Sequence, residues 1–286
     1  MSELTVVADG LGFVEAPRWR DGKLWFSDFY ARRVHTVDPS GKLEQVAYVA
    51  GQPSGLGFAP DGALMIVSSH DGHILRRHDG VTSILADIGQ IYRGGLNDMV
   101  VDGAGRCFVS AFPVPIVGAG TVPAVPTPDT VSIPLFRVDQ DGTVAVVAED
   151  LKIPNGMVVT PDGKQLIVAE TFGNRLTAFD IAADGSLSGR RVWADLGKRL
   201  PDGICLDAEG AVWVGSFSTS EYVRVREGGE VLQVIETPGR WAVSCVLGGA
   251  DGHDLYCATV ELEIADYLDG RGHGRIERAH VDVPAS

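Results

Sequence analysis

The sequence lacks the long apolar runs and the basic surface that would indicate several classes of protein. No apolar run approaches the roughly 18 residues of a membrane-spanning helix. The N-terminal segment, Met1-Ser2-Glu3-Leu4-Thr5, has neither the basic nor the apolar part of a signal peptide. The 24 basic side chains are outnumbered by 38 acidic ones, which gives a formal charge of −14. Because nucleic acids and anionic membranes bind basic faces, we expect neither as a partner.

Cysteine is also scarce, and the chain contains no C-x-x-C pair. The four cysteines are scattered through apolar segments, at Cys107, Cys205, Cys245 and Cys257. We expect buried free thiols in a reducing, cytoplasmic environment, with a cross-strand disulfide between Cys245 and Cys257 as the weaker alternative. The chain has no G-x-S-x-G turn and no G-x-G-x-x-G loop between a strand and a helix. These absences argue against an α/β-hydrolase serine and against nucleotide binding.

The sequence does contain an internal repeat, in which a turn ending in glycine is followed by a short apolar strand. The repeat glycines are Gly22, Gly62, Gly105, Gly163, Gly210 and Gly252, separated by 40, 43, 58, 47 and 42 residues. Short strands that recur about every 40–50 residues are typical of a β-propeller with four antiparallel strands per blade. The six copies predict an all-β, six-bladed β-propeller that occupies residues 1–286 as one domain.

The two ends of the chain are predicted to share one blade. Residues 4–8 and 275–281 each read as a single strand that lacks the rest of a repeat. If the two strands joined one sheet, they would close the ring and remove its open edge.

The longest repeat contains a proline-rich insertion, residues 111–134, which holds six of the fifteen prolines. Proline donates no ladder hydrogen bond, so this segment is expected to be a long loop. Its apolar residues, Phe112 among them, favour a lid over the functional site. Surface decoration is the alternative interpretation.

The repeat phase also selects a set of polar residues. Eight residues before a repeat glycine, the innermost strand of a blade should begin at the central channel. The residues at this position are Ser54, Asn97, Asn155, Asp202 and Ser244. In the first blade Glu15 lies one residue from the expected position. A Pro-x-Gly frame surrounds Ser54, Asn155 and Asp202, and it is expected to fix the direction of these side chains.

A ring of carboxylate and amide oxygens suits one divalent cation. Ca²⁺ is expected, with Mg²⁺, Mn²⁺ or Zn²⁺ as alternatives, although the absence of His and Cys from the ring argues against a structural zinc site. A ring of polar residues that only solvates the channel of a non-catalytic propeller is the other interpretation. The stretch that contains His70, His73 and His78 is interpreted as exposed hairpin turns, with a zinc site as its alternative.

At these residues the sequence resembles the senescence-marker-protein, gluconolactonase and luciferin-regenerating-enzyme family of six-bladed propellers. The resemblance covers nearly the whole chain. It rests on Glu15-Ala16-Pro17-Arg18-Trp19, Leu96-Asn97-Asp98, Ile153-Pro154-Asn155-Gly156, Pro201-Asp202-Gly203-Ile204-Cys205-Leu206-Asp207 and Ser244-Cys245-Val246-Leu247-Gly248-Gly249.

The resemblance implies a metal-dependent lactone hydrolase. Glu15, Asn155 and Asp202 would bind the cation, and Asn97 would contact the substrate or lie beside the ligands. Asp202 would also be the catalytic base, with metal-bound hydroxide as the rival nucleophile because metal coordination lowers the basicity of Asp202.

Two departures from the family pattern bear on the substrate. Some members have an arginine two residues before the channel asparagine, where this chain has Gly95, and the nearest arginine is Arg93. The insertion is apolar, so Phe112 is expected to contact the substrate together with Arg93 and Asn97. The expected substrate is a small lactone or ester that is less polar than an aldonolactone. The rival hypotheses are phosphotriester or other metal-assisted carbonyl chemistry at the same site, and a non-catalytic binding propeller. The sequence carries no signal for an oligomeric state.

Overall fold

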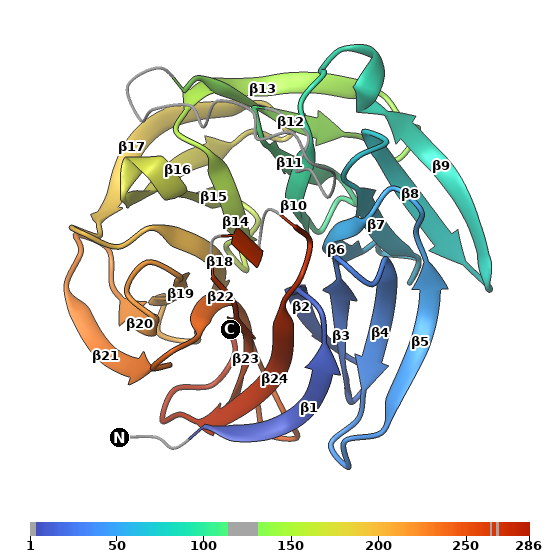
Figure 1. The fold of residues 1–286 in the computed structure, drawn as a ribbon. Coiled ribbons are helices and arrows are strands. Elements are labelled where there is room, and N and C mark those ends of the chain that lie inside the picture. Colours follow the sequence, from blue (N-terminus) through green and yellow to red (C-terminus); the bar gives the residue numbers. More distant parts are fainter. Residues whose placement is uncertain (1–3, 114–130, 264, 267–268) are drawn as a thin grey trace.

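A computed structural model of the chain describes residues 4–113, 131–263, 265–266 and 269–286. It shows six four-stranded antiparallel sheets arranged as blades around a central axis (Figure 1). The strands nearest the axis are β2, β6, β10, β14, β18 and β22, and the strand at the opposite edge of each sheet lies at the rim. The prediction of an all-β, six-bladed propeller is confirmed.

Five blades each use four consecutive strands. Blade 1 contains β2 (Val14–Arg20), β3 (Lys23–Asp28), β4 (Arg33–Val37) and β5 (Leu43–Tyr48). Blade 2 contains β6 (Pro53–Phe58), β7 (Leu64–Ser68), β8 (His73–His78) and β9 (Val81–Asp87). Blade 3 contains β10 (Leu96–Val101), β11 (Cys107–Ala111), β12 (Ile133–Val138) and β13 (Val144–Leu151). Blade 4 contains β14 (Pro154–Val159), β15 (Gln165–Glu170), β16 (Arg175–Ile181) and β17 (Leu187–Asp195). Blade 5 contains β18 (Pro201–Leu206), β19 (Val212–Ser216), β20 (Glu221–Val225) and β21 (Val231–Glu236).

Blade 6 combines strands from both ends of the chain. It contains β22 (Trp241–Gly248), β23 (Asp254–Glu261), β24 (His273–His280) and, at its rim, β1 (Thr5–Leu11). The first pair of the β1–β24 ladder joins Thr5 to Arg278. The predicted sharing of one blade by both termini is therefore confirmed, and this pairing closes the ring.

The turns of the repeat have the backbone conformation that their glycines predict. All six repeat glycines have positive φ, from 70° at Gly163 to 88° at Gly62. An L side chain at such a position would be strained, whereas glycine adopts it freely. The aspartates of the turns add a second restraint. For example, the backbone N–H of Ala63 donates to Asp61 Oδ1 at 3.1 Å.

The hydrophobic core lies between the facing surfaces of neighbouring blades. One cluster joins Met65 and Val67 of blade 2 to Met99 and Val109 of blade 3. Polar contacts add to this packing at the ends of the blades. Two 3₁₀ turns, η1 (Ile88–Gln90) and η2 (Thr171–Gly173), connect the strands without interrupting the sheets.

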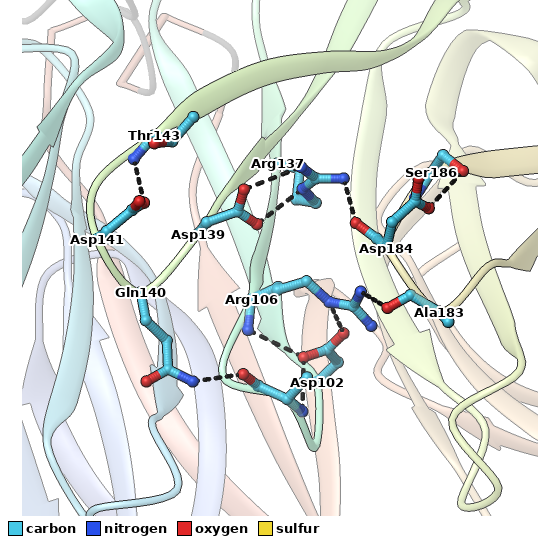
Figure 2. A network of polar contacts seen from close by, with 11 residues as sticks. Asp102, Arg106, Arg137, Asp139, Gln140, Asp141, Thr143, Ala183, Asp184 and Ser186 are labelled. Carbon is cyan, nitrogen blue, oxygen red and sulfur yellow. Dashed lines mark hydrogen bonds and ion pairs between the residues drawn. The ribbon is translucent and has the colours of Figure 1, made fainter.

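Two arginines of blade 3 donate hydrogen bonds to a hairpin of blade 4, near the end of inner strand β10 (Figure 2). Arg106 donates from Nε to Asp102 at 2.7 Å and from Nη1 to the carbonyl oxygen of Ala183 at 2.9 Å. Arg137 donates to the carbonyl oxygen of Asp184 at 2.7 Å. These bonds connect the turn after β10 and strand β12 to the turn before β17.

The described residues include no helix with the length and apolar character needed to traverse a bilayer. The cytoplasmic location stays a prediction from the sequence.

The four cysteines are free and buried, as predicted. Cys245 and Cys257 face each other across β22 and β23 but form no disulfide. Cys205 Sγ lies 3.7 Å from Cys245 Sγ, so thiols of blades 5 and 6 are in contact.

Burial predicts that these thiols are unreactive in the native protein. It raises the pKa of Cys107 to about 12 and raises the pKa of Cys245 and of Cys257 well above the usual range. Since the thiolate is the reactive form, we expect a disulfide reagent at pH 8 to label no cysteine of the native protein within minutes. The same reagent should label all four in guanidinium chloride. One fast-reacting equivalent in the native protein would contradict the burial.

Candidate active site

The six residues selected by the repeat phase lie at the same end of the six inner strands. In β2, β6, β10, β14 and β18 the residue is the second of the strand, and in β22 it is the fourth. We call this set the channel ring; its members are Glu15, Ser54, Asn97, Asn155, Asp202 and Ser244. The two carboxylates are partly exposed, whereas the amides and hydroxyls are buried.

Five members of the channel ring are connected by polar contacts. Ser54 Oγ donates to Glu15 Oε2 at 3.0 Å and also lies 3.4 Å from Asn97 Oδ1. Asn97 Nδ2 donates to Asn155 Oδ1 at 2.9 Å. Asn155 hydrogen-bonds in turn to Asp202. The structure therefore brings together the proposed ligands Glu15, Asn155 and Asp202, with Asn97 beside them.

Each inner strand departs from regular pairing at its ring residue. The ladder register shifts between Glu15 and Arg18 in β2, between Pro154 and Met157 in β14, and at the corresponding place in the other four inner strands. A bulge of this kind bends the strand and re-aims a side chain. The shared irregularity explains how residues from six separate sheets form one ring.

The Pro-x-Gly frames have a specific packing role. A Cβ added at Gly55 would lie 2.5 Å from the backbone N of Met99, and one at Gly156 would lie 2.7 Å from the carbonyl oxygen of Asp202. Both distances are too short for real atoms, so glycine is required where the next inner strand packs against this one. Close approach of neighbouring strands, rather than positive φ, accounts for these glycines.

The two carboxylates of the ring have no cationic partner in the part of the chain that the structure describes. Within the described part of the chain neither Glu15 nor Asp202 forms an ion pair with Lys, Arg or His. Burial, together with the charge of Asp98, raises the pKa of Glu15 to about 7. Burial and the charges of Glu15 and Asp98 raise the pKa of Asp202 well above its usual range.

This donor set fits a divalent cation. Two like charges in a partly buried space repel each other unless a cation lies between them. Carboxylate and amide oxygens are also the ligands that Ca²⁺ prefers. The chemistry of the channel ring therefore matches the cation that the sequence predicts.

Sequence reasoning missed two charged residues beside the ring. Asp98 directly follows Asn97, and Arg18 Nη2 lies 3.1 Å from Asp98 Oδ1. The repeat count selected one residue per blade and so passed over both. One signal was available, because Asp98 occupies the position that is glycine in the three Pro-x-Gly frames.

The remaining predicted substrate residues lie at the ring side of blade 3. Arg93 is exposed in the loop before β10, and the half-buried Phe112 directly follows β11. The carbonyl oxygen of Phe112 accepts a hydrogen bond from the Tyr92 hydroxyl at 2.6 Å. Within the described residues, neither Arg93 nor Phe112 forms a hydrogen bond to the channel ring. Most of the predicted lid, residues 114–130, lies outside the described residues.

The histidine-rich stretch forms no metal site in the described residues. His73 Nε2 lies 3.7 Å from Asp87, and His78 Nε2 lies 3.6 Å from Asp79. Over the described ranges, no three His, Cys, Asp or Glu side chains could hold a metal together. His70 lies in an exposed turn, whereas His73 and His78 are the first and last residues of β8 and His73 is half-buried. The channel ring differs in kind, because it relies on amide oxygens as well as two carboxylates.

Comparison with known proteins agrees with this geometry. A family model described as the SMP-30/Gluconolactonase/LRE-like region matches residues 13–261. The chain belongs to this family. The match includes the inner strands of all six blades in full and the whole channel ring.

Two relatives and one solved structure illustrate the similarity. The chain is 29% identical over 266 residues to the pentonolactonase XacC of Haloferax volcanii, covering 91% of this chain and 85% of XacC. It is 25% identical over 278 residues to a 6-deoxy-6-sulfogluconolactonase of Pseudomonas putida, covering 94% and 91%. A gluconolactonase structure from Xanthomonas campestris matches with a TM-score of 0.78 and 25% identity, covering 99% of this chain and 90% of that one.

The close packing of the inner strands predicts the effect of Gly203→Ala. A Cβ at Gly203 would lie 2.7 Å from Ser244 Cα, so the backbone of blade 6 would have to move. We expect the free energy of unfolding to fall by about 1–3 kcal/mol, the usual cost of overpacking. Urea unfolding measures this loss.

Gly103→Ala is the matched control. Gly103 has no neighbouring atom within 4 Å of an added Cβ and no positive φ. Its unfolding free energy should change by no more than about 0.5 kcal/mol, as for most surface substitutions. Equal stabilities of the two variants would contradict the role of close approach at Gly203.

Proposed function

We propose that the protein is a metal-dependent lactonase, which opens a small lactone to its hydroxy acid. The observation that carries this proposal is the pair of carboxylates, Glu15 and Asp202, which share the channel ring with Asn155 and have no cationic partner among the described residues. The family relationship supports it, because relatives over most of the chain are named as lactonases.

Glu15, Asn155 and Asp202 would hold the cation, and Ca²⁺ fits this all-oxygen set. Asn155 Oδ1 accepts one hydrogen bond from Asn97, and a carbonyl oxygen has a second lone pair available for a metal. Ser54 holds Glu15 in place through its hydroxyl. When bound, the cation supplies polarisation of the lactone carbonyl and stabilises negative charge on its oxygen.

Asp202 is proposed as the base that activates water. An ionised carboxylate has two oxygens, so one oxygen of Asp202 can accept the proton of a water while the other binds the cation. Asp202 takes a proton from the water as the new carbon–oxygen bond forms. It returns that proton to the ester oxygen of the lactone as the bond between this oxygen and the carbonyl carbon breaks. The hydrogen bond from Asn155 keeps the carboxylate oriented during both transfers.

We further propose that the substrate is less polar than an aldonolactone. Half-buried aromatic side chains follow the ring-side ends of three second strands: Phe112 after β11, Phe172 after β15 and Phe217 after β19. The Phe217 ring packs 5.2 Å from that of Trp241, which begins β22. An aldonolactone offers hydroxyls on every face, and aromatic surfaces leave such groups without hydrogen-bond partners.

Asp202→Asn tests the mechanism. Asparagine keeps the size of the side chain but removes the base and one negative charge. We expect kcat for lactone hydrolysis to fall roughly 10²- to 10⁴-fold, the usual contribution of a general base, and Ca²⁺ binding to weaken. Acid release in a pH-stat and calorimetric titration with Ca²⁺ measure the two effects.

Two comparisons make this test specific. Asp162→Asn changes an exposed turn aspartate whose Oδ1 accepts from the Lys164 N–H, and it should keep full activity. Wild-type protein stripped of divalent cations by EDTA should lose hydrolysis and regain it with Ca²⁺. Full activity of Asp202→Asn, or of the stripped protein, would disprove the proposed mechanism.

A panel of lactones tests the proposed substrate polarity. We expect kcat/KM to rise by about fourfold for each methylene of an alkyl substituent that packs on the aromatic side chains, given about 0.8 kcal/mol per buried methylene. Phe217→Ala should remove part of this gain and change glucono-δ-lactone hydrolysis little. A highest kcat/KM for aldonolactones would show that the polarity is misassigned.

A further inference from the structure

A third carboxylate, that of Asp98, lies beside the channel ring. Asp98 is buried and follows Asn97 in β10. Its Oδ1 accepts hydrogen bonds from the Met99 backbone N–H at 2.7 Å and from Arg18 Nη2 at 3.1 Å. Asp98 is linked to the ring through Asn97, whose Oδ1 lies 3.4 Å from Ser54 Oγ, and Ser54 in turn donates to Glu15 at 3.0 Å.

Arg18 reaches Asp98 from a blade that is not its neighbour. Arg18 belongs to β2 of blade 1 and Asp98 to β10 of blade 3, with β6 of blade 2 between them around the axis (Figure 1). At this level β6 carries Gly55, whose missing Cβ would lie 2.7 Å from the Asp98 carbonyl carbon. Because β6 presents no side chain there, β10 packs close to it and Asp98 comes within reach of Arg18.

The guanidinium of Arg18 has oxygen acceptors on several sides. Nη1 donates to the carbonyl oxygen of Pro17 at 2.9 Å. Nη2 donates to the carbonyl oxygen of Met99 at 2.6 Å as well as to Asp98. One carboxylate and two backbone carbonyls are the kind of oxygens that would also bind a metal cation. Arg18 is largely buried, with 20% of its side chain exposed, so its charge acts in a poorly screened environment.

We propose that Arg18 is a built-in cation that neutralises Asp98, so that the channel ring keeps two carboxylates for a single divalent cation. This inference rests on the metal site of the proposed function. Without Arg18, three carboxylates would face one cation. Without Asp98, the positive charge of Arg18 would be left unpaired near Glu15 and Asp202.

The proposal predicts effects of opposite sign for the two partners. Arg18→Met keeps a long side chain but removes the cation, and it should tighten Ca²⁺ binding by about tenfold or more. Asp98→Asn keeps the shape but leaves Arg18 unpaired, and it should weaken Ca²⁺ binding by a similar factor. In the double variant the two charges are removed together, and the affinity should return to within about threefold of wild type. Calorimetric titration with Ca²⁺ at low ionic strength measures all four proteins.

A merely structural ion pair gives a different result. If Arg18 and Asp98 only stabilise the fold, both single variants should weaken binding or leave it unchanged, and the double variant should bind no better than either. The pair of Arg106 and Asp102 is the matched control, because it joins the same two residue types at the opposite end of β10. Arg106→Met should lower the melting temperature and leave Ca²⁺ affinity within about twofold of wild type.

The outcomes separate this inference from the proposed function. If wild-type protein binds no divalent cation, the metal site itself is wrong. If wild type binds Ca²⁺ and Asp98→Asn binds it as tightly or more tightly, the role of Arg18 is wrong. Asp98→Asn removes no packing volume, so it decides the question even if Arg18→Met does not fold.

Discussion

The repulsion between acidic side chains at the propeller axis is the constraint on which the rest of the site depends. Six inner strands converge there and bring Glu15, Asp98 and Asp202 close together. In addition to burial, the charge of Asp98 raises the pKa of Glu15, and the charges of Glu15 and Asp98 raise the pKa of Asp202. Such a group of like charges needs cations. Arg18 supplies one of them from within the chain, and the all-oxygen ligand set of the channel ring suits a divalent ion for the other two carboxylates.

The convergence itself depends on small residues at the ring. Gly55, Gly156 and Gly203 each lie where the neighbouring inner strand leaves no room for a Cβ. The bulges at the ring residues turn their side chains away from the direction that a regular strand would give them. Packing density and the geometry of the proposed ligands are therefore coupled, since a wider inner circle would separate the oxygens that are proposed to bind one ion.

Much of this arrangement could be predicted from the sequence, because it repeats. The glycine spacing predicted six blades, and counting back from those glycines placed Asn97, Asn155 and Asp202 at equivalent positions. The ion pair of Arg18 with Asp98 could not be found in this way. It joins blades 1 and 3, and contact between blades that are not neighbours depends on the diameter of the inner circle rather than on any local pattern. The frames around Ser54, Asn155 and Asp202 were recognised, but their physical reason became clear only from the distances between neighbouring strands.

The fold also separates the charge-bearing part of the site from the part that is proposed to select the substrate. The channel ring is built on short inner strands that pack tightly on both sides, so its residues can change little without loss of the fold. Phe112, Phe172 and Phe217 instead follow second strands, in connections at the same end of the blades, and all three are half-buried. Substitutions in these connections alter what rests above the ring and leave its charges in place. Relatives named for different sugar lactones are consistent with such a division, because one set of oxygens can serve substrates of different shape and polarity.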